Sequence, residues 1–252
     1  MLKTVDQALK ILMMFNKETP YWRTNELADQ LSMNKATVYR MLETLRINDF
    51  LVKNEKNKTY HLGVAAWELH LMAYDQLNIK EILMEPLQQL FKQTEESVFF
   101  TLRKGIQGIT MIVIEPQNKV KFSVETGSRA PLYVGASYHS ILAYQKPEII
   151  DRIIKQGLQK YTPLTITDPE VLKKVLADVR ENGYAMSKGE YTPDTITLAV
   201  PIRSSNKEIN SSLTVSGPTY RFDQAKQDKV LPLLFETKKK VEQLISRYEV
   251  IF

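Results

Sequence analysis

Residues Thr37 to Gly63 read TVYRMLETLRINDFLVKNEKNKTYHLG, and they contain the strongest indication of the fold. The first half of this stretch carries apolar residues at the i, i+3, i+4 and i+7 spacing of a half-buried helix, namely Val38, Met41, Leu42 and Leu45. Its second half is typical of two short strands around a charged turn over residues 54–58. The pattern therefore predicts a helix followed by a basic hairpin.

Two further helical patterns precede this stretch. The segment from Thr4 to about Asn16 repeats apolar residues at helical spacing, with Thr4 as the expected N-cap. A second helix is expected to begin at the capping residue Thr24, and only residues 32–34 separate it from the third helix, whose expected cap is Asn34. Two short helices joined by a tight turn, with a polar N-terminal half on the second, predict a helix-turn-helix. The alternative is a small helical bundle.

A recognition helix enters the major groove by its N-terminal end, so its first residues should contact base edges. The predicted DNA-binding residues are Thr24, Asn34, Lys35, Ala36, Thr37, Tyr39 and Arg40, and Lys53, Lys56 and Lys58 of the hairpin could lie along the DNA backbone as a wing. Lys and Arg also neutralise phosphates, which supplies most of the sequence-independent affinity. For the hairpin, the alternative is a solvated edge on which lysine prevents aggregation.

The charge distribution agrees with a DNA-binding N-terminus. The net charge is +5, and residues 1–62 carry 10 Lys and Arg against 7 Asp and Glu, an excess of +3 over a quarter of the chain. The remaining residues carry 24 against 22, an excess of only +2. A basic bias over a short module suits a phosphate-binding surface, although many surfaces are as basic by chance.

The composition excludes several classes of function. There is no cysteine, and the three histidines, His61, His70 and His139, lie far apart in the chain, so neither a thiol nucleophile nor a metal or cofactor site is expected. No phosphate-binding glycine loop or nucleophile elbow is present; Ser137 beside His139 is not a triad, and Glu181 and Glu190 are expected on a solvated surface. No apolar run approaches the ~18 residues of a membrane span, and the polar N-terminus is unlike a signal peptide. A cytoplasmic protein with no membrane partner is expected.

Separated motifs along the chain, in order, give it a strong resemblance to the IclR family of bacterial regulators. The segments Thr37–Leu42 and Tyr60–Gly63 are similar to the DNA-binding half of that family. The later matching segments are Gly127–Ser137, Glu181–Glu190 with its Gly-Tyr-Ala-x-Ser-x-Gly-Glu signature, Leu198–Ile202, and Ser216–Phe222 with its Gly-Pro-x-x-Arg turn. Departures from the family pattern are Ser137, Tyr138 and His139, and Asp194 where many relatives carry glycine.

The resemblance implies an α+β chain with three parts. These are an N-terminal winged helix-turn-helix over residues 1–63, a linker helix over residues 64–78, and a GAF-like (profilin-like) effector-binding domain over residues 79–252. Consecutive strands with helices on their flanks in the last part independently predict an antiparallel-rich α+β domain. Family members pair through the linker helix and the DNA-binding domains, so a homodimer, or a homotetramer of dimers, is expected. The alternative is that Trp67, Leu71 and Tyr74 cover the adjacent domain.

Carried onto matching positions, the resemblance places an effector site at Gly135, Ala136, Ser137, Ser187, Thr197, Thr214 and Ser216. Backbone amides after Gly135 would favour a carboxylate, and the hydroxyls would complete its hydrogen bonds. The family expectation is a small organic acid or sugar acid. The alternative is that these small residues only allow close helix–sheet packing.

We therefore predict a ligand-responsive DNA-binding transcriptional regulator, a repressor of a catabolic or metabolic operon that binds a near-palindromic operator as a dimer. The competing hypotheses are a protein-interaction module whose winged helix contacts protein, and a small-molecule enzyme built on a GAF-like domain.

Overall fold

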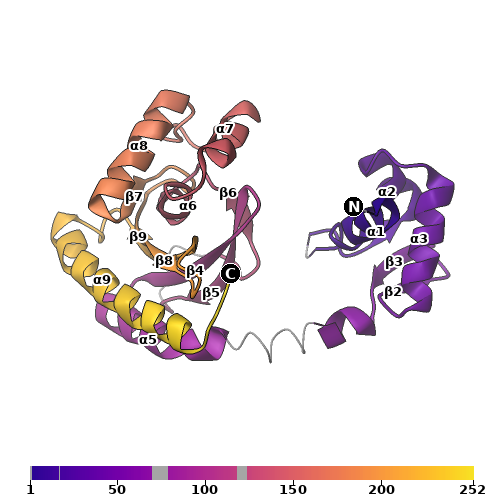
Figure 1. Ribbon diagram of the computed structural model, residues 1–252, viewed down its shortest axis with the longest axis horizontal. Helices are drawn as coiled ribbons and strands as arrows, with labels where there is room; N and C mark the ends of the chain where they lie inside the picture. The colour runs from indigo at the N-terminus through magenta and orange to yellow at the C-terminus, as the bar shows by residue number, and fades with distance from the viewer. Residues whose placement is uncertain (1, 17, 70–78, 118–123) are drawn as a thin grey trace. The chain divides into compact units, whose positions relative to one another are not determined.

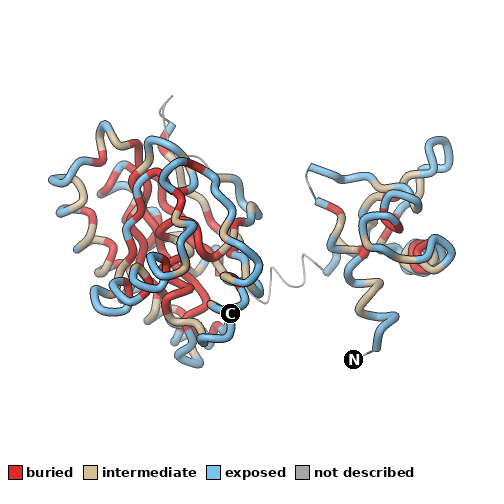
Figure 2. Tube along the Cα trace, turned by 90° about the horizontal axis from the view of Figure 1, so that it is seen from above, coloured by how far each residue is buried: buried red, intermediate tan, exposed pale blue. Residues whose placement is uncertain are grey.

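The computed structural model describes residues 2–16, 18–69, 79–117 and 124–252. The chain divides into two compact units, Met1–Asn78 and Ile79–Phe252, each with its own hydrophobic core. Figure 1 shows the elements, and Figure 2 shows buried residues gathered inside each unit. Residues 64–69 are helical, but the rest of the predicted linker helix, with Leu71 and Tyr74, lies outside the described residues. So does most of the segment 119–126, whose β-branched and aromatic residues predict a strand.

The N-terminal unit is a winged helix-turn-helix, as predicted. Its elements are α1 (Lys3–Leu12), β1 (Trp22–Arg23), α2 (Thr24–Gln30), α3 (Lys35–Ile47), β2 (Leu51–Asn54) and β3 (Thr59–Leu62). The strands form an antiparallel sheet in the order β1-β3-β2. The core joins all three helices to the hairpin through Ile11, Leu27, Val38, Leu42, Leu51 and Tyr60. Burial of these side chains fixes α3 against the hairpin.

One predicted helix cap is confirmed and two are wrong. The Asn34 side chain accepts a hydrogen bond from the Ala36 amide at 2.9 Å and caps α3. Thr24 is instead the first residue of α2, because the Glu26 carboxylate accepts from the Arg23 amide at 2.8 Å and moves the cap to Arg23. Thr4 lies inside α1, which starts at Lys3 without a side-chain cap.

The C-terminal unit is the expected α+β domain, built on one antiparallel sheet of order β6-β5-β4-β9-β8-β7. Its strands are β4 (Ser97–Lys104), β5 (Gln107–Ile114), β6 (Arg129–Pro131), β7 (Ala185–Lys188), β8 (Thr195–Arg203) and β9 (Ile209–Pro218). Its helices are α5 (Ile79–Thr94), α6 (Ala136–Leu142), α7 (Pro147–Lys155), α8 (Pro169–Asn182) and α9 (Gln224–Arg247). Helices α5 and α9 lie side by side on one face of the sheet, and α6, α7 and α8 lie on the other (Figure 1).

The two faces of this sheet differ in chemistry, because successive side chains on a strand point to opposite faces. The face toward α5 and α9 is apolar, with Val98, Phe100, Leu198, Val200, Leu213 and Val215 in one core cluster. The face under α6 carries hydroxyls. Ser187, Thr197, Ser216 and Ser97 are neighbours across four adjacent strands. The hydroxyl-bearing face positions the candidate effector site.

Asp194 illustrates how the chain accommodates a departure from the family pattern. Its backbone is left-handed, with φ of +55°, in the turn before β8. Glycine adopts this conformation without strain, and Asp and Asn are among the side chains that tolerate it best. This chain therefore forms with aspartate a left-handed turn that glycine would also adopt.

Candidate DNA-binding surface and effector site

The predicted base-reading residues lie at the N-terminal end of α3. Asn34, Lys35, Ala36, Tyr39 and Arg40 are exposed and Thr37 is half-buried. Lys56 and Lys58 are exposed at the hairpin tip, and Thr24 is half-buried at the start of α2. The N-terminal unit thus presents the helix end and the basic tip to solvent, as a groove-reading surface requires.

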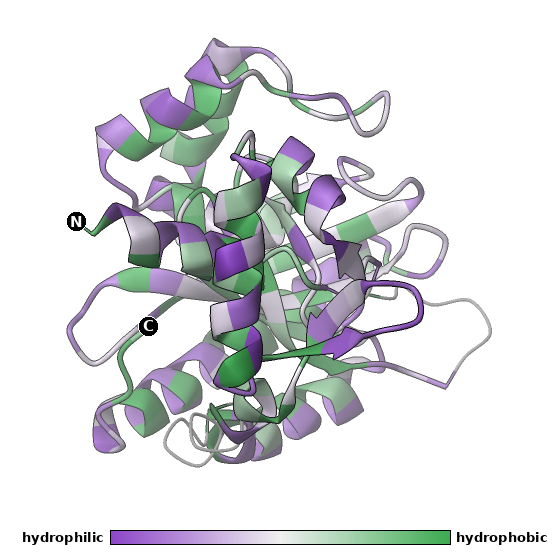
Figure 3. Cartoon of the chain, turned by 90° about the vertical axis from the view of Figure 1, so that its right-hand side faces the viewer, coloured by the Kyte–Doolittle hydropathy of each residue, from purple (hydrophilic) through white to green (hydrophobic). Residues whose placement is uncertain are grey.

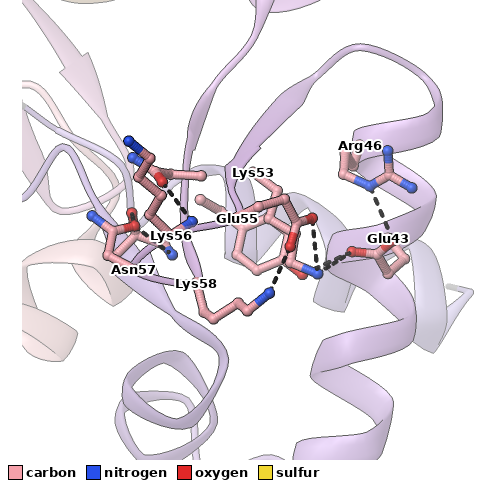
Figure 4. A network of polar contacts seen from close by, with 10 residues as sticks. Glu43, Arg46, Lys53, Glu55, Lys56, Asn57 and Lys58 are labelled. Carbon is pink, nitrogen blue, oxygen red and sulfur yellow. Dashed lines mark hydrogen bonds and ion pairs between the residues drawn. The ribbon is translucent and has the colours of Figure 1, made fainter.

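A network of charged and hydrogen-bonded side chains connects α3 to the hairpin (Figure 4). The Tyr60 hydroxyl donates to Glu43 Oε1 at 2.8 Å, and Arg46 Nε donates to Glu43 Oε2 at 3.0 Å. Burial alone would raise the pKa of Glu43, but the hydrogen bonds from Tyr60 and Arg46 outweigh it and lower that pKa. Glu43 is therefore a fixed anion on the recognition helix.

The hairpin lysines Lys53 and Lys58 differ in which carboxylates lie near their ammonium groups. Lys58 Nζ lies 2.7 Å from Glu55 Oε2, so part of its charge is compensated at the tip. Lys53 Nζ lies 3.7 Å from Glu43 and 3.6 Å from Glu55. Sequence reasoning placed Lys53 with the wing lysines along the DNA backbone and missed its contact with Glu43, because a helix residue and a strand residue meet only in the folded unit.

The start of α6 is the centre of the candidate effector site. Gly135 adopts φ of +89°, which only glycine tolerates well, and its amide donates to Glu190 Oε2 at 3.1 Å. The Ala136 amide donates to Ser187 Oγ at 3.0 Å. Ala136, the first residue whose amide was predicted to receive an effector carboxylate, and its neighbour Gly135 thus both donate to acceptors within the protein.

Glu190 is buried, with 8% of its surface exposed, so its predicted place on a solvated surface is wrong. The hydroxyls of Thr162 and Thr165 donate to its backbone carbonyl and fold the turn after β7 inward. Its carboxylate lies 3.7 Å from Nε2 of the fully buried His139, which also contacts the Tyr133 carbonyl at 2.7 Å. Glu181 is exposed, as predicted.

The hydroxyl residues predicted for the effector site are brought together between α6 and the sheet. The Thr214 hydroxyl donates to Ser137 Oγ at 2.9 Å, and the Thr197 and Ser216 hydroxyls lie 2.7 Å apart. Strand register places Ser187 beside Thr197 and Thr197 beside Ser216. Tyr138, one of the residues that depart from the family pattern, packs its ring against Gly108. A Cβ added at Gly108 would lie 2.4 Å from that ring.

The burial of Glu190 predicts a pH-dependent cost to stability. Burial raises the pKa of Glu190, although His139 and the Gly135 amide act in the opposite direction. Because the folded pKa lies above the unfolded value, the protonated acid stabilises the fold at low pH, and this contribution is lost as pH rises through the folded pKa. Glu190→Gln should therefore gain thermal stability relative to the wild type between pH about 4 and pH about 7. Far-UV circular dichroism at both pH values measures this, and an unchanged difference would contradict it.

The described residues form neither a metal site nor a membrane-spanning helix. Within residues 2–16, 18–69, 79–117 and 124–252, no group of three or more His, Asp or Glu residues is placed to hold a metal ion. Of the helices in the described ranges, none has the length and apolar character needed to cross a membrane.

Comparison with known proteins agrees with this architecture. Residues 4–55 match the IclR helix-turn-helix domain, and residues 71–243 match the bacterial transcriptional regulator IclR C-terminal domain. The HTH-type transcriptional regulator KipR of Bacillus subtilis is 30% identical over 97% of this chain and 96% of its own length. The HTH-type transcriptional repressor AllR of Klebsiella pneumoniae is 24% identical over 87% of this chain and 81% of its own length.

Solved structures match over nearly the whole chain. A putative IclR transcriptional regulator from Silicibacter sp. TM1040 has a TM-score of 0.90 and 27% identity, and covers 96% of both chains. An IclR transcriptional regulator from Alicyclobacillus acidocaldarius has a TM-score of 0.82 and 27% identity, over 97% of this chain and 99% of the other. A winged helix-turn-helix joined to an effector domain defines a DNA-binding transcriptional regulator. This chain belongs to the IclR family, whose members are regulators and not enzymes.

Proposed function

We propose that this protein represses a catabolic or metabolic operon by binding a near-palindromic operator as a homodimer, and that a small-molecule effector changes its operator affinity. The observation that carries the proposal is the exposed N-terminal end of α3. The relative from K. pneumoniae is named a repressor, which supports the same sign of regulation here. A dimer would place two recognition helices in successive major grooves.

The DNA contacts follow from the position of each side chain. Base contacts are assigned to Lys35, Ala36, Thr37, Tyr39 and Arg40, and contacts to the DNA backbone to Thr24, Asn34, Lys56 and Lys58. Arg40 has the strongest expected effect on sequence preference, because a guanidinium can donate two hydrogen bonds to one guanine edge.

An exposed apolar stripe supports the dimer. Leu2, just before α1, and Val5 and Leu9 within it are 77%, 53% and 53% exposed, although apolar residues at this spacing usually face a core. Figure 3 shows green, apolar residues on the helix that starts at the N-terminus. A second copy of the same surface would bury this stripe, as in a two-fold symmetric interface.

The effector is assigned to the hydroxyl-lined region between α6 and the sheet, with Gly135, Ala136, Ser137, Ser187, Thr197, Thr214 and Ser216. Since the amides of Gly135 and Ala136 already have acceptors in Glu190 and Ser187, an acidic effector would have to compete with Glu190 for the Gly135 amide. Differential affinity of the effector for two arrangements of the dimer would then shift operator binding through residues 64–78.

Selection of genomic DNA fragments by the purified protein, repeated with Arg40→Ala, tests the proposal. We expect a palindromic sequence for the wild type, and a loss of about 1–3 kcal/mol in operator binding for the variant. Lys173→Ala is the matched control, since it removes an exposed basic side chain from α8, far along the chain from the HTH. A wild type without sequence preference at moderate salt, with and without candidate acids, would sink direct DNA readout.

A further inference from the structure

Lys53 and Lys58 of the hairpin both form ion pairs, and Lys53 is the more enclosed of the two. It lies on β2, and 16% of its side chain is exposed, against 67% for Lys58 at the tip. A lysine that binds a DNA phosphate needs an ammonium group exposed to solvent, because its contribution to affinity comes from releasing the counterions condensed on the DNA. The position of Lys53 therefore points to a different role.

The Lys53 ammonium contacts groups from three parts of the unit. It lies within 4 Å of two carboxylates, at 3.7 Å from Glu43 on α3 and 3.6 Å from Glu55 at the tip. It also lies 5.7 Å from the ring centre of Tyr39 and 5.7 Å from that of Tyr60, within the range of cation–π attraction. Tyr39 is a predicted base-contacting residue, and it is 47% exposed.

Glu43 is itself held in place from both sides. Tyr60, which is 1% exposed, donates to one carboxylate oxygen, and Arg46 donates to the other. An acidic side chain on a DNA-facing helix would repel phosphate, so its presence here calls for a compensating role. Fixed by Tyr60 and Arg46, Glu43 anchors the Lys53 ammonium beside the Tyr39 ring (Figure 4 shows Glu43 and Lys53 in contact).

We infer that Lys53 and Glu43 are positioning residues of the DNA-reading surface: they hold Tyr39 and the hairpin in one arrangement and do not themselves contact DNA. The inference rests on the proposed operator-binding function. It predicts that loss of the Lys53 charge weakens recognition of the operator while leaving the electrostatic, sequence-independent part of binding unchanged.

Lys53→Met, compared with Lys56→Met, tests this in the full-length protein. Both variants lose one positive charge, and Lys56 lies at the exposed tip. Lys53→Met should weaken operator binding by about three- to tenfold, the size of a partly enclosed cation–π contact. Binding to mixed-sequence duplex DNA is then measured as log affinity against log salt concentration. The slope for Lys53→Met should equal that of the wild type, whereas the magnitude of the slope for Lys56→Met should be smaller by about 0.9.

Glu43→Gln is the second variant, because the amide keeps an acceptor for the Tyr60 hydroxyl and loses the attraction for Lys53. It should reproduce the loss of operator affinity. Tryptophan fluorescence checks folding of this unit directly, since both tryptophans, Trp22 and Trp67, belong to it.

Three outcomes would overturn the inference. A salt slope reduced in Lys53→Met as in Lys56→Met would show a direct phosphate contact. Operator affinities within about twofold of the wild type for both Lys53→Met and Glu43→Gln would show no positioning role. Unfolding of both variants would show a purely structural one. Failure of the proposed function is distinguishable, because the wild type itself would then show no operator preference.

Discussion

Replacing Arg221 by alanine should lower the free energy of unfolding of the C-terminal unit by about 3–5 kcal/mol. Glu96 is 2% exposed, and Arg221 is its bidentate partner, with Nε 2.7 Å from Oε1 and Nη2 2.9 Å from Oε2. Removing the guanidinium leaves a buried carboxylate without its counter-charge, which costs far more than the loss of an exposed ion pair.

The surrounding backbone leaves Glu96 little room to find another partner. A Cβ added at Gly217 would lie 2.6 Å from Glu96 Oε2, so the carboxylate packs directly on the Gly-Pro turn. The Phe222 ring, fully buried, closes the same turn. In this chain the Gly-Pro-x-x-Arg motif of the family resemblance therefore has a structural role. Its arginine pairs with the buried Glu96, and its glycine leaves room for the Glu96 carboxylate.

Urea unfolding followed by far-UV circular dichroism measures the loss, with tryptophan fluorescence as an internal control that reports only the N-terminal unit. Arg221→Lys should lose less, because the charge stays while the bidentate geometry is lost. Glu96→Gln combined with Arg221→Met should recover part of the stability, since no buried charge remains. A loss below about 1 kcal/mol for Arg221→Ala would contradict the assignment.

The helix-turn-helix was predictable because its signals are local. The spacing of Val38, Met41 and Leu42 determines which face of α3 is buried, and Asn34 caps the helix within two residues of itself. The contact between Tyr60 and Glu43 spans 17 residues between a strand and a helix. No periodicity within one element reports such a contact, so the network around Lys53 was not predicted.

The effector region shows the same division between local and tertiary signals. The family resemblance singled out hydroxyl residues that the structure brings together, although whether they bind an effector stays a proposal. Glu190 was expected in solvent because it flanks a predicted strand and glutamate is seldom buried without a partner. Its burial depends on Thr162 and Thr165, which come from a distant loop and hold its carbonyl. One sequence contains no signal for that contact.

Only some of the apolar residues in and next to α1 pack into the core of the N-terminal unit. Ile11 is fully buried and Phe15, just after the helix, is 8% exposed, while Val5 and Leu9 are each 53% exposed. The periodicity correctly predicted a helix, but it could not distinguish a face buried within the unit from a face buried by a second copy.

Leu9→Lys should convert the proposed dimer to a monomer and weaken operator binding by about 10²-fold, because the second half-site is no longer bound intramolecularly. A lysine in the middle of the stripe would place two like charges close together across a two-fold interface, at a desolvation cost that the remaining apolar contacts cannot offset. Multi-angle light scattering measures the mass of the protein, and titrations of the whole operator and of an isolated half-site measure the avidity.

Ile47→Lys is the matched control, since Ile47 is 71% exposed at the end of α3, outside the stripe. A Leu9→Lys protein that keeps both its dimeric mass and its operator affinity would show that the α1 stripe is not the contact, and would move the interface to the exposed residues after the hairpin, Val64 and Leu69.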